Sequence, residues 1–116
     1  MKIRTIYFKV PIMKEAVDFW RSFTGREPHK RTEKYSEFRA DNINLGLVLN
    51  DFGDEFSGSN CCPVFEFADS EVQTIIERAK NIGAIVVLDA LNDPNIKGVI
   101  FADPWGNEFE VTKFHD

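Results

Sequence analysis

Two glutamates near the C-terminus are the side chains whose type and spacing best suit binding chemistry. Glu108 and Glu110 alternate with Phe109 and Val111, which predicts a strand with one acidic face and one apolar face. A carboxylate in an apolar cleft can bind a ligand cation or, because desolvation raises its pKa, act as a general base. A hydrogen bond or an ion pair within the sheet is the structural alternative for Glu110.

The cysteines and histidines carry a weaker chemical signal. Cys61 and Cys62 are adjacent, so they point to opposite faces of a strand and do not suggest a disulfide framework. Cys62 could be a nucleophile or a soft metal ligand, but the pattern places no histidine or lysine beside it, and packing in a cleft is the alternative. His29 and His115 lie in a predicted hairpin and at the C-terminal end. The lack of a disulfide framework favours a reducing, cytoplasmic compartment.

Length and charge bound the class of protein. The 116 residues are 43% hydrophobic and include 11 phenylalanines, enough for one compact domain. Lysine and arginine number 14 against 19 aspartates and glutamates, and the net charge of −5 argues against a nucleic-acid partner. No apolar run is long enough for a membrane span, and Arg4 and Lys9 interrupt the N-terminal segment, so we expect neither a signal peptide nor a membrane partner.

The elements that position these residues follow from hydrophobic periodicity. In the first half, alternation predicts three strands, and helical spacing predicts one helix that ends at Gly25. The strands are Ile3–Val10, Tyr35–Ala40 and Ile43–Leu49, and the helix is Met13–Thr24. The polar, basic segment at residues 26–34 is predicted to be an exposed hairpin.

The second half has the same order of elements. A strand begins at Cys61, where Pro63 indicates an edge strand or an irregular start. Ser70 and Gln73 form a capping box that predicts the start of a helix, and Gly83 ends this helix. The remaining predicted elements are strands Ala84–Leu88 and Val99–Ala102, a loop at Leu91–Gly98 and the hairpin Phe101–Lys113.

Both halves therefore have the pattern of one βαβββ unit. The simplest account is a duplicated unit, residues 1–52 and 61–116, joined by a linker at residues 53–60 that is rich in glycine, serine and aspartate. A unit of about 55 residues buries little surface alone, so each needs a partner sheet. The predicted fold class is α+β, with mixed sheets covered by helices in a single domain.

The duplication and the Asp-Pro-Trp-Gly-Asn turn at residues 103–107 resemble the vicinal oxygen chelate superfamily, which includes glyoxalases, bleomycin resistance proteins and dioxygenases. The helices that end at Thr24-Gly25 and at Gly83 fit the same pattern. The resemblance implies two incurved mixed sheets with helices on the convex side and a ligand cleft on the concave side. Under this fold the residues that point into the cleft are Tyr7, Asn44, Cys62 and Glu110.

The sequence departs from the enzymes of this superfamily at the positions of their metal ligands. In those enzymes four side chains, mostly histidine and glutamate, usually bind the metal. The matching positions here are Thr5, Gly46 (with Asn44 as the other option), Cys62 and Glu110. Only Glu110 is a ligand of the usual type, and Cys62 with Glu110 would be half of a soft site. Because a catalytic metal needs about three protein ligands, we expect no metal and no cofactor.

A metal-poor cleft resembles the bleomycin-resistance branch, whose members bind an antibiotic and do no chemistry on it. This resemblance, with the acidic charge, implies a protein that binds or sequesters a cationic, partly planar small molecule without turnover. No catalytic residue is expected. The residues expected to contact the ligand are Tyr7, Phe38, Asn44, Val48, Cys62, Trp105, Glu108 and Glu110.

Two other functions stay open at this point. The first is a divergent lyase, isomerase or transferase of the same superfamily with a reduced metal site, glyoxalase-like or dioxygenase-like in its chemistry. The second is a fold that serves protein interaction and binds no small ligand. The resemblance also implies a homodimer, since short two-unit chains of this superfamily commonly dimerise.

Overall fold

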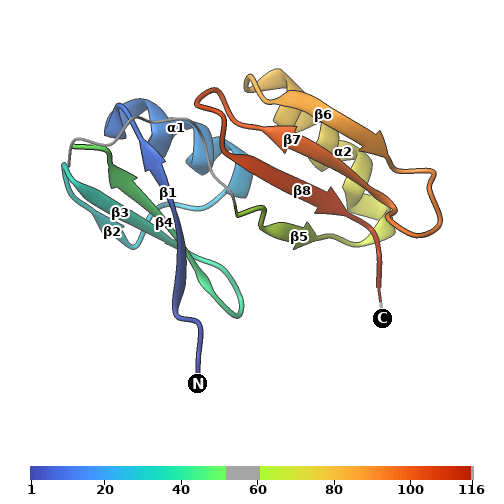
Figure 1. Cartoon of the computed structure of the whole chain (residues 1–116), viewed down its shortest axis with the longest axis horizontal. Helices are drawn as coiled ribbons and strands as arrows, with labels where there is room; N and C mark the ends of the chain where they lie inside the picture. Colours follow the sequence, from blue (N-terminus) through green and yellow to red (C-terminus); the bar gives the residue numbers. More distant parts are fainter. Residues whose placement is uncertain (52–60, 116) are drawn as a thin grey trace. The chain divides into compact units, whose positions relative to one another are not determined.

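The computed structural model describes residues 1–51 and 61–115, and the chain divides along its sequence into two compact units, one from each half (Figure 1). The predicted linker at residues 53–60 lies outside the described residues. In its described residues, each unit contains one helix and one four-stranded sheet. None of the helices in the described residues is long and apolar enough to cross a membrane.

The first unit is a mixed four-stranded sheet with one helix. Its elements are β1 (Thr5–Val10), α1 (Met13–Thr24), β2 (Lys30–Arg31), β3 (Tyr35–Arg39) and β4 (Asn44–Leu49). The strand order is β1-β4-β3-β2, in which β1 runs parallel to β4 and the other neighbours are antiparallel. The hairpin predicted at residues 26–34 contributes β2, whose two side chains are exposed.

The second unit repeats this topology. Its elements are β5 (Val64–Glu66), α2 (Asp69–Asn81), β6 (Ile85–Ala90), β7 (Gly98–Ala102) and β8 (Glu108–Thr112). The strand order is β5-β8-β7-β6, and β5 is again parallel to β8 while the other pairs are antiparallel. The shared order of elements and strands confirms the duplicated βαβββ unit and the α+β class.

The core of the first unit forms between α1 and one face of its sheet. Trp20 is fully buried, and its ring centroid lies 5.3 Å from that of Phe8 on β1 and 5.6 Å from that of Phe23. Gly25 ends the helix in the left-handed conformation, at φ 68°, and its N–H donates to the carbonyl of Arg21 over 2.9 Å. The predicted helix and its C-terminal cap are thus confirmed.

The core of the second unit is built in the same way from α2 and its sheet. The rings of Phe101 and Phe109 are fully buried and stack with their centroids 5.6 Å apart. The buried stripe of the helix matches the spacing in the sequence. Its residues are Val72, Ile75, Ile76 and Ala79.

The start of α2 differs from the prediction. The helix begins at Asp69, and its N-cap is Ala68, which makes no side-chain capping hydrogen bond. Ser70 therefore lies inside the helix, and the predicted capping box with Gln73 is wrong. Asp69 and Glu71 place two carboxylates in the first turn, where they stabilise the positive end of the helix dipole in place of a side-chain cap.

Pro63 marks the irregular start of an edge strand, as predicted. The strand expected from Cys61 begins only at Val64, and β5 lies at one edge of its sheet. Proline has no N–H to give to a strand ladder, but its carbonyl remains an acceptor. The carbonyl of Pro63 accepts the backbone N–H of Glu110 over 2.9 Å, so the chain just before β5 still anchors the middle of β8.

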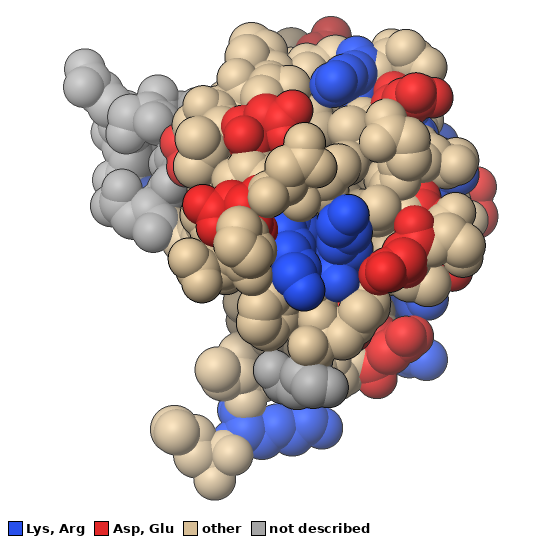
Figure 2. Space-filling view, turned by 90° about the vertical axis from the view of Figure 1, so that its right-hand side faces the viewer, with Lys and Arg blue, Asp and Glu red and all other residues tan. Residues whose placement is uncertain are grey.

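Charged side chains of both signs are interspersed on the face shown in Figure 2. Lysine and arginine side chains (blue) lie among aspartate and glutamate side chains (red) and uncharged ones. Among the described residues, this face therefore has no continuous basic surface of the kind that binds a nucleic-acid backbone.

Candidate functional site

Each sheet has one face that packs against its helix, the covered face, and an opposite face, the open face. Side chains alternate between the two along every strand. In β8, Phe109 and Val111 are fully buried on the covered face, whereas Glu108 and Glu110 are half-buried on the open face. The strand register places Val64 of β5 beside Glu110. The acidic and apolar faces predicted for this strand are therefore correct.

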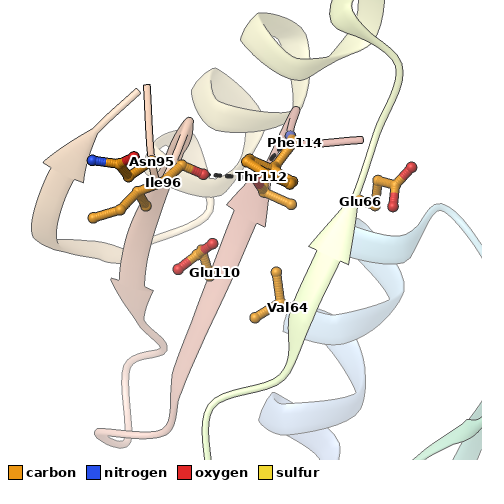
Figure 3. Close-up of a pocket in the computed structure, with 7 residues that line it drawn as sticks. All are labelled: Val64, Glu66, Asn95, Ile96, Glu110, Thr112 and Phe114. Carbon is orange, nitrogen blue, oxygen red and sulfur yellow. Dashed lines mark hydrogen bonds between the residues drawn. The ribbon is translucent and has the colours of Figure 1, made fainter. Parts of the chain in front are cut away.

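A pocket of about 450 Å³ lies on the open face of the second unit (Figure 3). Strands β5 and β8 contribute one side of it, and the loop between β6 and β7 contributes the other. The side chain of Glu110 lies at the centre of the labelled residues in Figure 3. The lining residues are Val64, Glu66, Asn95, Ile96, Glu110, Thr112 and Phe114.

The carboxylate of Glu110 has neither a hydrogen bond nor an ion pair within the described residues. Its backbone N–H is bonded to Pro63, so only the side chain is left without a donor. Burial raises the pKa of this carboxyl above its ordinary value. A half-buried carboxylate with a raised pKa and no positive neighbour is a group whose negative charge an incoming cation would stabilise.

Gly98 of β7 makes room for this carboxylate. A Cβ atom built on Gly98 would lie 3.0 Å from Oε2 of Glu110 and 2.9 Å from the carbonyl oxygen of Val111. The backbone of Gly98 is not in the left-handed region, so its conformation does not require glycine. Glycine in the interior of a strand often marks a close approach, and here the carboxylate lies directly against the sheet.

Thr112 ties the walls of the pocket together. Its hydroxyl lies 3.2 Å from the carbonyl oxygen of Ile96 and 3.1 Å from that of Lys97, and it accepts the N–H of Phe114 over 3.0 Å. Lys97 also places its Nζ 5.5 Å from the ring centroid of Phe114. The hydroxyl proton is therefore directed to the loop carbonyls, and Thr112 does not serve as a donor to Glu110.

The turn between β7 and β8 is held by its first residue. The Asp103 carboxylate accepts the N–H of Trp105 over 3.0 Å, the N–H of Asn107 over 2.8 Å and the side-chain amide of Asn107 over 3.1 Å. Asp103 and Asn107 are both 1% exposed. The Asp-Pro-Trp-Gly-Asn motif is therefore explained by the geometry of the hairpin that carries Glu110.

A second carboxylate, Glu37 of β3, is fully buried on the open face of the first unit. Arg4 donates to it over 3.0 and 3.4 Å, Thr5 donates over 3.2 Å, and Nε2 of His29 lies 2.7 Å away. The hydroxyl of Tyr35 also donates to it. Burial alone would raise the pKa of Glu37, but the bonds from Tyr35, Arg4 and His29 outweigh it and lower the pKa to about 2.

The positions that match the superfamily's metal ligands do not form a metal site here. The hydroxyl of Thr5 is bonded to Glu37, and the space above Gly46 is taken by Tyr35, whose hydroxyl oxygen would lie 2.8 Å from a Cβ at that glycine. Across the described residues there is no group of three or more histidine, cysteine, aspartate or glutamate side chains arranged to hold a metal ion. The residues present therefore do not fit the metal that the fold family implies.

Purified protein is expected to contain less than one divalent metal ion per ten chains after dialysis, because threonine and glycine side chains cannot replace imidazole or carboxylate ligands. Elemental analysis by plasma mass spectrometry measures this content. One tightly held zinc, nickel, manganese or iron ion per chain would contradict the expectation and favour the enzyme hypothesis.

The residues predicted to contact a ligand in the first unit divide between the two faces. Tyr7, Asn44 and Val48 lie on the open face. Phe38 is 1% exposed and pairs with Leu45 on the covered face. Its ring is part of the core, which corrects the expectation that it contacts a ligand.

In the second unit, only Glu110 among the predicted residues lines the pocket. Glu108 lies on the open face two residues earlier, and Trp105 is half-buried in the turn. Cys62 is outside the pocket walls, and partial burial together with the charges of Glu110 and Glu108 raises the pKa of its thiol. A raised pKa disfavours the thiolate, so the environment of Cys62 does not activate it as a nucleophile.

Several residues of these sites were not identified from the sequence. Thr112 continues the alternation of Glu108 and Glu110, which correctly predicts its face, but its bonds to the loop that lines the pocket have no signal in the sequence. Glu37 likewise alternates with the covered Phe38, but its partners Arg4 and His29 come from separate segments without a shared pattern. The loop residues that close the pocket have no signal in the sequence, because they are positioned by contacts with β8.

Comparison with known proteins gives matches at the level of family and fold. The model of the Glyoxalase-like domain family matches residues 5–112. A glyoxalase-related enzyme from Fulvimarina pelagi aligns with TM-score 0.81 and 18% identity over 96% of this chain and 86% of that chain. A glyoxalase/bleomycin resistance protein/dioxygenase family enzyme from Burkholderia phytofirmans PsJN aligns with TM-score 0.78 and 14% identity over 96% and 97% of the two chains.

Lactoylglutathione lyase from Agrobacterium tumefaciens aligns with TM-score 0.67 and 20% identity over 94% of this chain and 90% of that chain. No curated protein sequence matches this chain. Two βαβββ units with identical strand order, in the fold of these structures, define a protein of the glyoxalase fold. The chain belongs to the Glyoxalase-like domain family, within the vicinal oxygen chelate superfamily.

Proposed function

We propose that this protein binds a cationic, partly planar small molecule reversibly at Glu110 and does not transform it. The observation that carries this proposal is the Glu110 carboxylate, which is half-buried in a pocket of about 450 Å³ and has no hydrogen-bond or ion-pair partner in the described residues. A charge-assisted hydrogen bond to such a group contributes about 1.5–3 kcal/mol when it is sheltered from water.

The apolar walls of the pocket suit the uncharged part of such a ligand. Val64 and Phe114 are among the exposed large hydrophobic side chains, and Ile96 lies on the opposite wall. The ring of Phe114 offers a face to a planar group, although Lys97 already lies 5.5 Å from its centroid. A small ligand is typically held by apolar walls with a few polar groups that fix its orientation, which is the composition of this pocket.

Binding without turnover is proposed because, among the described lining residues, the second titratable group is already hydrogen-bonded elsewhere. General acid–base chemistry commonly pairs two titratable groups within hydrogen-bond reach of the substrate. The other carboxylate in the lining, Glu66, is bonded over 2.7 Å to Nδ1 of His115. A pocket with one carboxylate left for the ligand, and no second group among the described lining residues positioned to act with it, is what we expect of a sequestering protein of the bleomycin-resistance type.

A divergent lyase, isomerase or transferase is the second candidate. The raised pKa of Glu110 favours it, because a carboxyl whose pKa lies nearer neutrality is a more effective general base. Several structures with this fold are named as enzymes, including the lactoylglutathione lyase. The two functions differ in one observable, the chemical identity of the ligand after binding.

Isothermal titration calorimetry against a panel of cationic aromatic antibiotics and dyes tests the proposal. We expect saturable binding of at least one member with one site per chain, and recovery of an unaltered ligand by mass spectrometry. Recovery of a ligand with a changed mass would contradict binding without turnover. Anionic and neutral aromatic compounds are titrated for comparison. If these bind and no member of the cationic panel does, the proposed cationic class of ligand is contradicted.

We also propose that the protein is a cytoplasmic homodimer. Neither Cys61 nor Cys62 forms a disulfide within the described residues, and both are exposed, which suits a reducing compartment. Sedimentation equilibrium is expected to give a mass near twice the chain mass of 13.3 kDa at micromolar concentrations. A mass of one chain across that range would contradict the dimer and leave the pocket of the second unit unaffected, since one chain supplies all of its described lining residues.

A further inference from the structure

The open faces of the two units can be compared strand by strand, because the strand order is the same. In each unit the register aligns four residues in a row that crosses the middle of the sheet. In the first unit this row is Tyr7, Gly46, Glu37 and Lys30, and in the second it is Val64, Glu110, Ile100 and Leu88. Each row therefore contains one carboxylate.

In the first unit the protein itself supplies the donors that this carboxylate needs. Arg4 and Thr5 donate to Glu37, Tyr35 donates its hydroxyl, and His29 contributes a ring nitrogen at 2.7 Å. A fully buried carboxylate requires this, because each unsatisfied oxygen would lose its hydration without compensation. The cluster shows how this fold satisfies a carboxylate on its open face, namely with several N–H and O–H donors.

In the second unit the row lacks these donors. The side chains beside Glu110 in the row, Val64 and Ile100, are apolar. The hydroxyl of Thr112 is directed to the carbonyls of the neighbouring loop, and Gly98, against which the carboxylate lies, has no side chain that could donate to it. Since no described residue donates to the Glu110 side chain, we take its donors to be water or the bound molecule.

We propose that the molecule bound at Glu110 carries a cation with several N–H donors, a primary ammonium or a guanidinium group, attached to an apolar body. This inference rests on the proposed function and narrows its ligand class. A primary ammonium has three N–H donors and a guanidinium has five, so either replaces what Arg4, Tyr35 and His29 supply to Glu37. A quaternary ammonium has the same charge and no N–H group, so it leaves the carboxylate oxygens unbonded.

Two probes matched in charge and apolar body test the inference: phenylbutylamine and its N-trimethylated analogue. Calorimetry with the full chain is expected to show the primary amine binding at least about tenfold more tightly. Ligand-induced shifts of the methyl signals of Val64 and Ile96 in NMR spectra are expected to place the amine in the pocket. A trimethylated probe that binds equally well or better would overturn the inference and leave the proposed cationic function standing.

Binding of neither probe, and of no other cation, would overturn both the inference and the proposed function. Glu110→Gln provides the internal comparison, because glutamine keeps the shape of the side chain and removes the charge. In this variant the preference for the primary amine is expected to fall to about twofold or less. Glu108→Gln, on the same strand and face but outside the pocket walls, is expected to keep the preference. If Glu110→Gln keeps the full preference for the primary amine, the N–H groups of the amine bind to an acceptor other than Glu110, and the inference is overturned.

Discussion

Replacing Glu37 with glutamine is expected to lower the free energy of unfolding by about 3 kcal/mol. Glu37 is fully buried, and its pKa is lowered from 4.5 to about 2 by hydrogen bonds from Tyr35, Arg4 and His29 that outweigh the effect of burial. Each pKa unit corresponds to about 1.4 kcal/mol, and the neutral amide loses this charge-assisted stabilisation. Urea denaturation followed by circular dichroism, with linear extrapolation to water, measures the change.

Glu33→Gln is the matched control for this prediction. Glu33 is exposed in the turn between β2 and β3, close to Glu37 in the sequence, and takes part in no buried cluster. Its substitution is expected to change the free energy of unfolding by no more than about 0.5 kcal/mol. Equal effects of the two substitutions would show that the Glu37 cluster contributes no more than a surface charge.

The same cluster predicts a pH dependence of stability. The pKa of Glu37 is lower in the folded protein than the ordinary value of 4.5, so its contribution is fully present above about pH 4.5. This contribution is lost as the pH falls toward about 2, where the carboxyl takes up a proton also in the folded state. The loss of stability between these two pH values is expected to be less steep in Glu37→Gln. Denaturation series at several pH values compare the two proteins, and parallel curves would contradict the lowered pKa.

Replacing Glu110 with glutamine is expected to weaken the binding of a cationic ligand by tenfold or more. The carboxylate is the negative group of the pocket that has no donor in the described residues, and the amide keeps its size while removing its charge. Stability is expected to stay the same or to rise slightly, because the substitution removes a poorly solvated charge and breaks no ion pair. Calorimetry and thermal denaturation measure the two effects.

Glu108→Gln is the control for Glu110→Gln. Both glutamates lie on the open face of β8, so the two variants have the same net charge, but Glu108 does not line the pocket. Ligand affinity in Glu108→Gln is expected to stay within about twofold of that of the unmodified protein, because the loss of one nearby charge outside the pocket has a small effect. An unchanged affinity in Glu110→Gln would reject the site and leave the fold unaffected, and equal losses in both variants would indicate a general effect of charge.

Glu37 and Glu110 show how position decides the role of the same side chain. Both are carboxylates in the central row of an open face, yet the pKa of Glu37 is lowered and that of Glu110 is raised. The difference is the supply of donors, which Glu37 receives from four side chains and Glu110 does not receive within the described residues. The first therefore stabilises the fold, and the second is available to a ligand.

The features that could be predicted from the sequence are those that depend on neighbours along the chain. Alternation in β8 placed Glu108 and Glu110 on one face, helical spacing and Gly25 located α1 and its end, and the turn before β8 followed from its residue types. The duplication was visible because both units repeat the same order of local patterns. Such features arise from periodicity and backbone preference within a few residues, which a single sequence contains.

Which residues meet across the fold could be seen only once the strands had paired and the loops had packed. Phe38 is a core residue because its pairing with Leu45 places it on the face that the helix covers. Alternation within one strand separates its two faces but does not show which of them packs against the helix. Arg4 and His29 reach Glu37 across 33 and 8 residues of chain, and Ile96 accepts from Thr112 across 16. These contacts form only when strands pair and loops pack. The hydrogen bonds that Glu37 receives, and those that Glu110 does not receive within the described residues, therefore depend on long-range geometry.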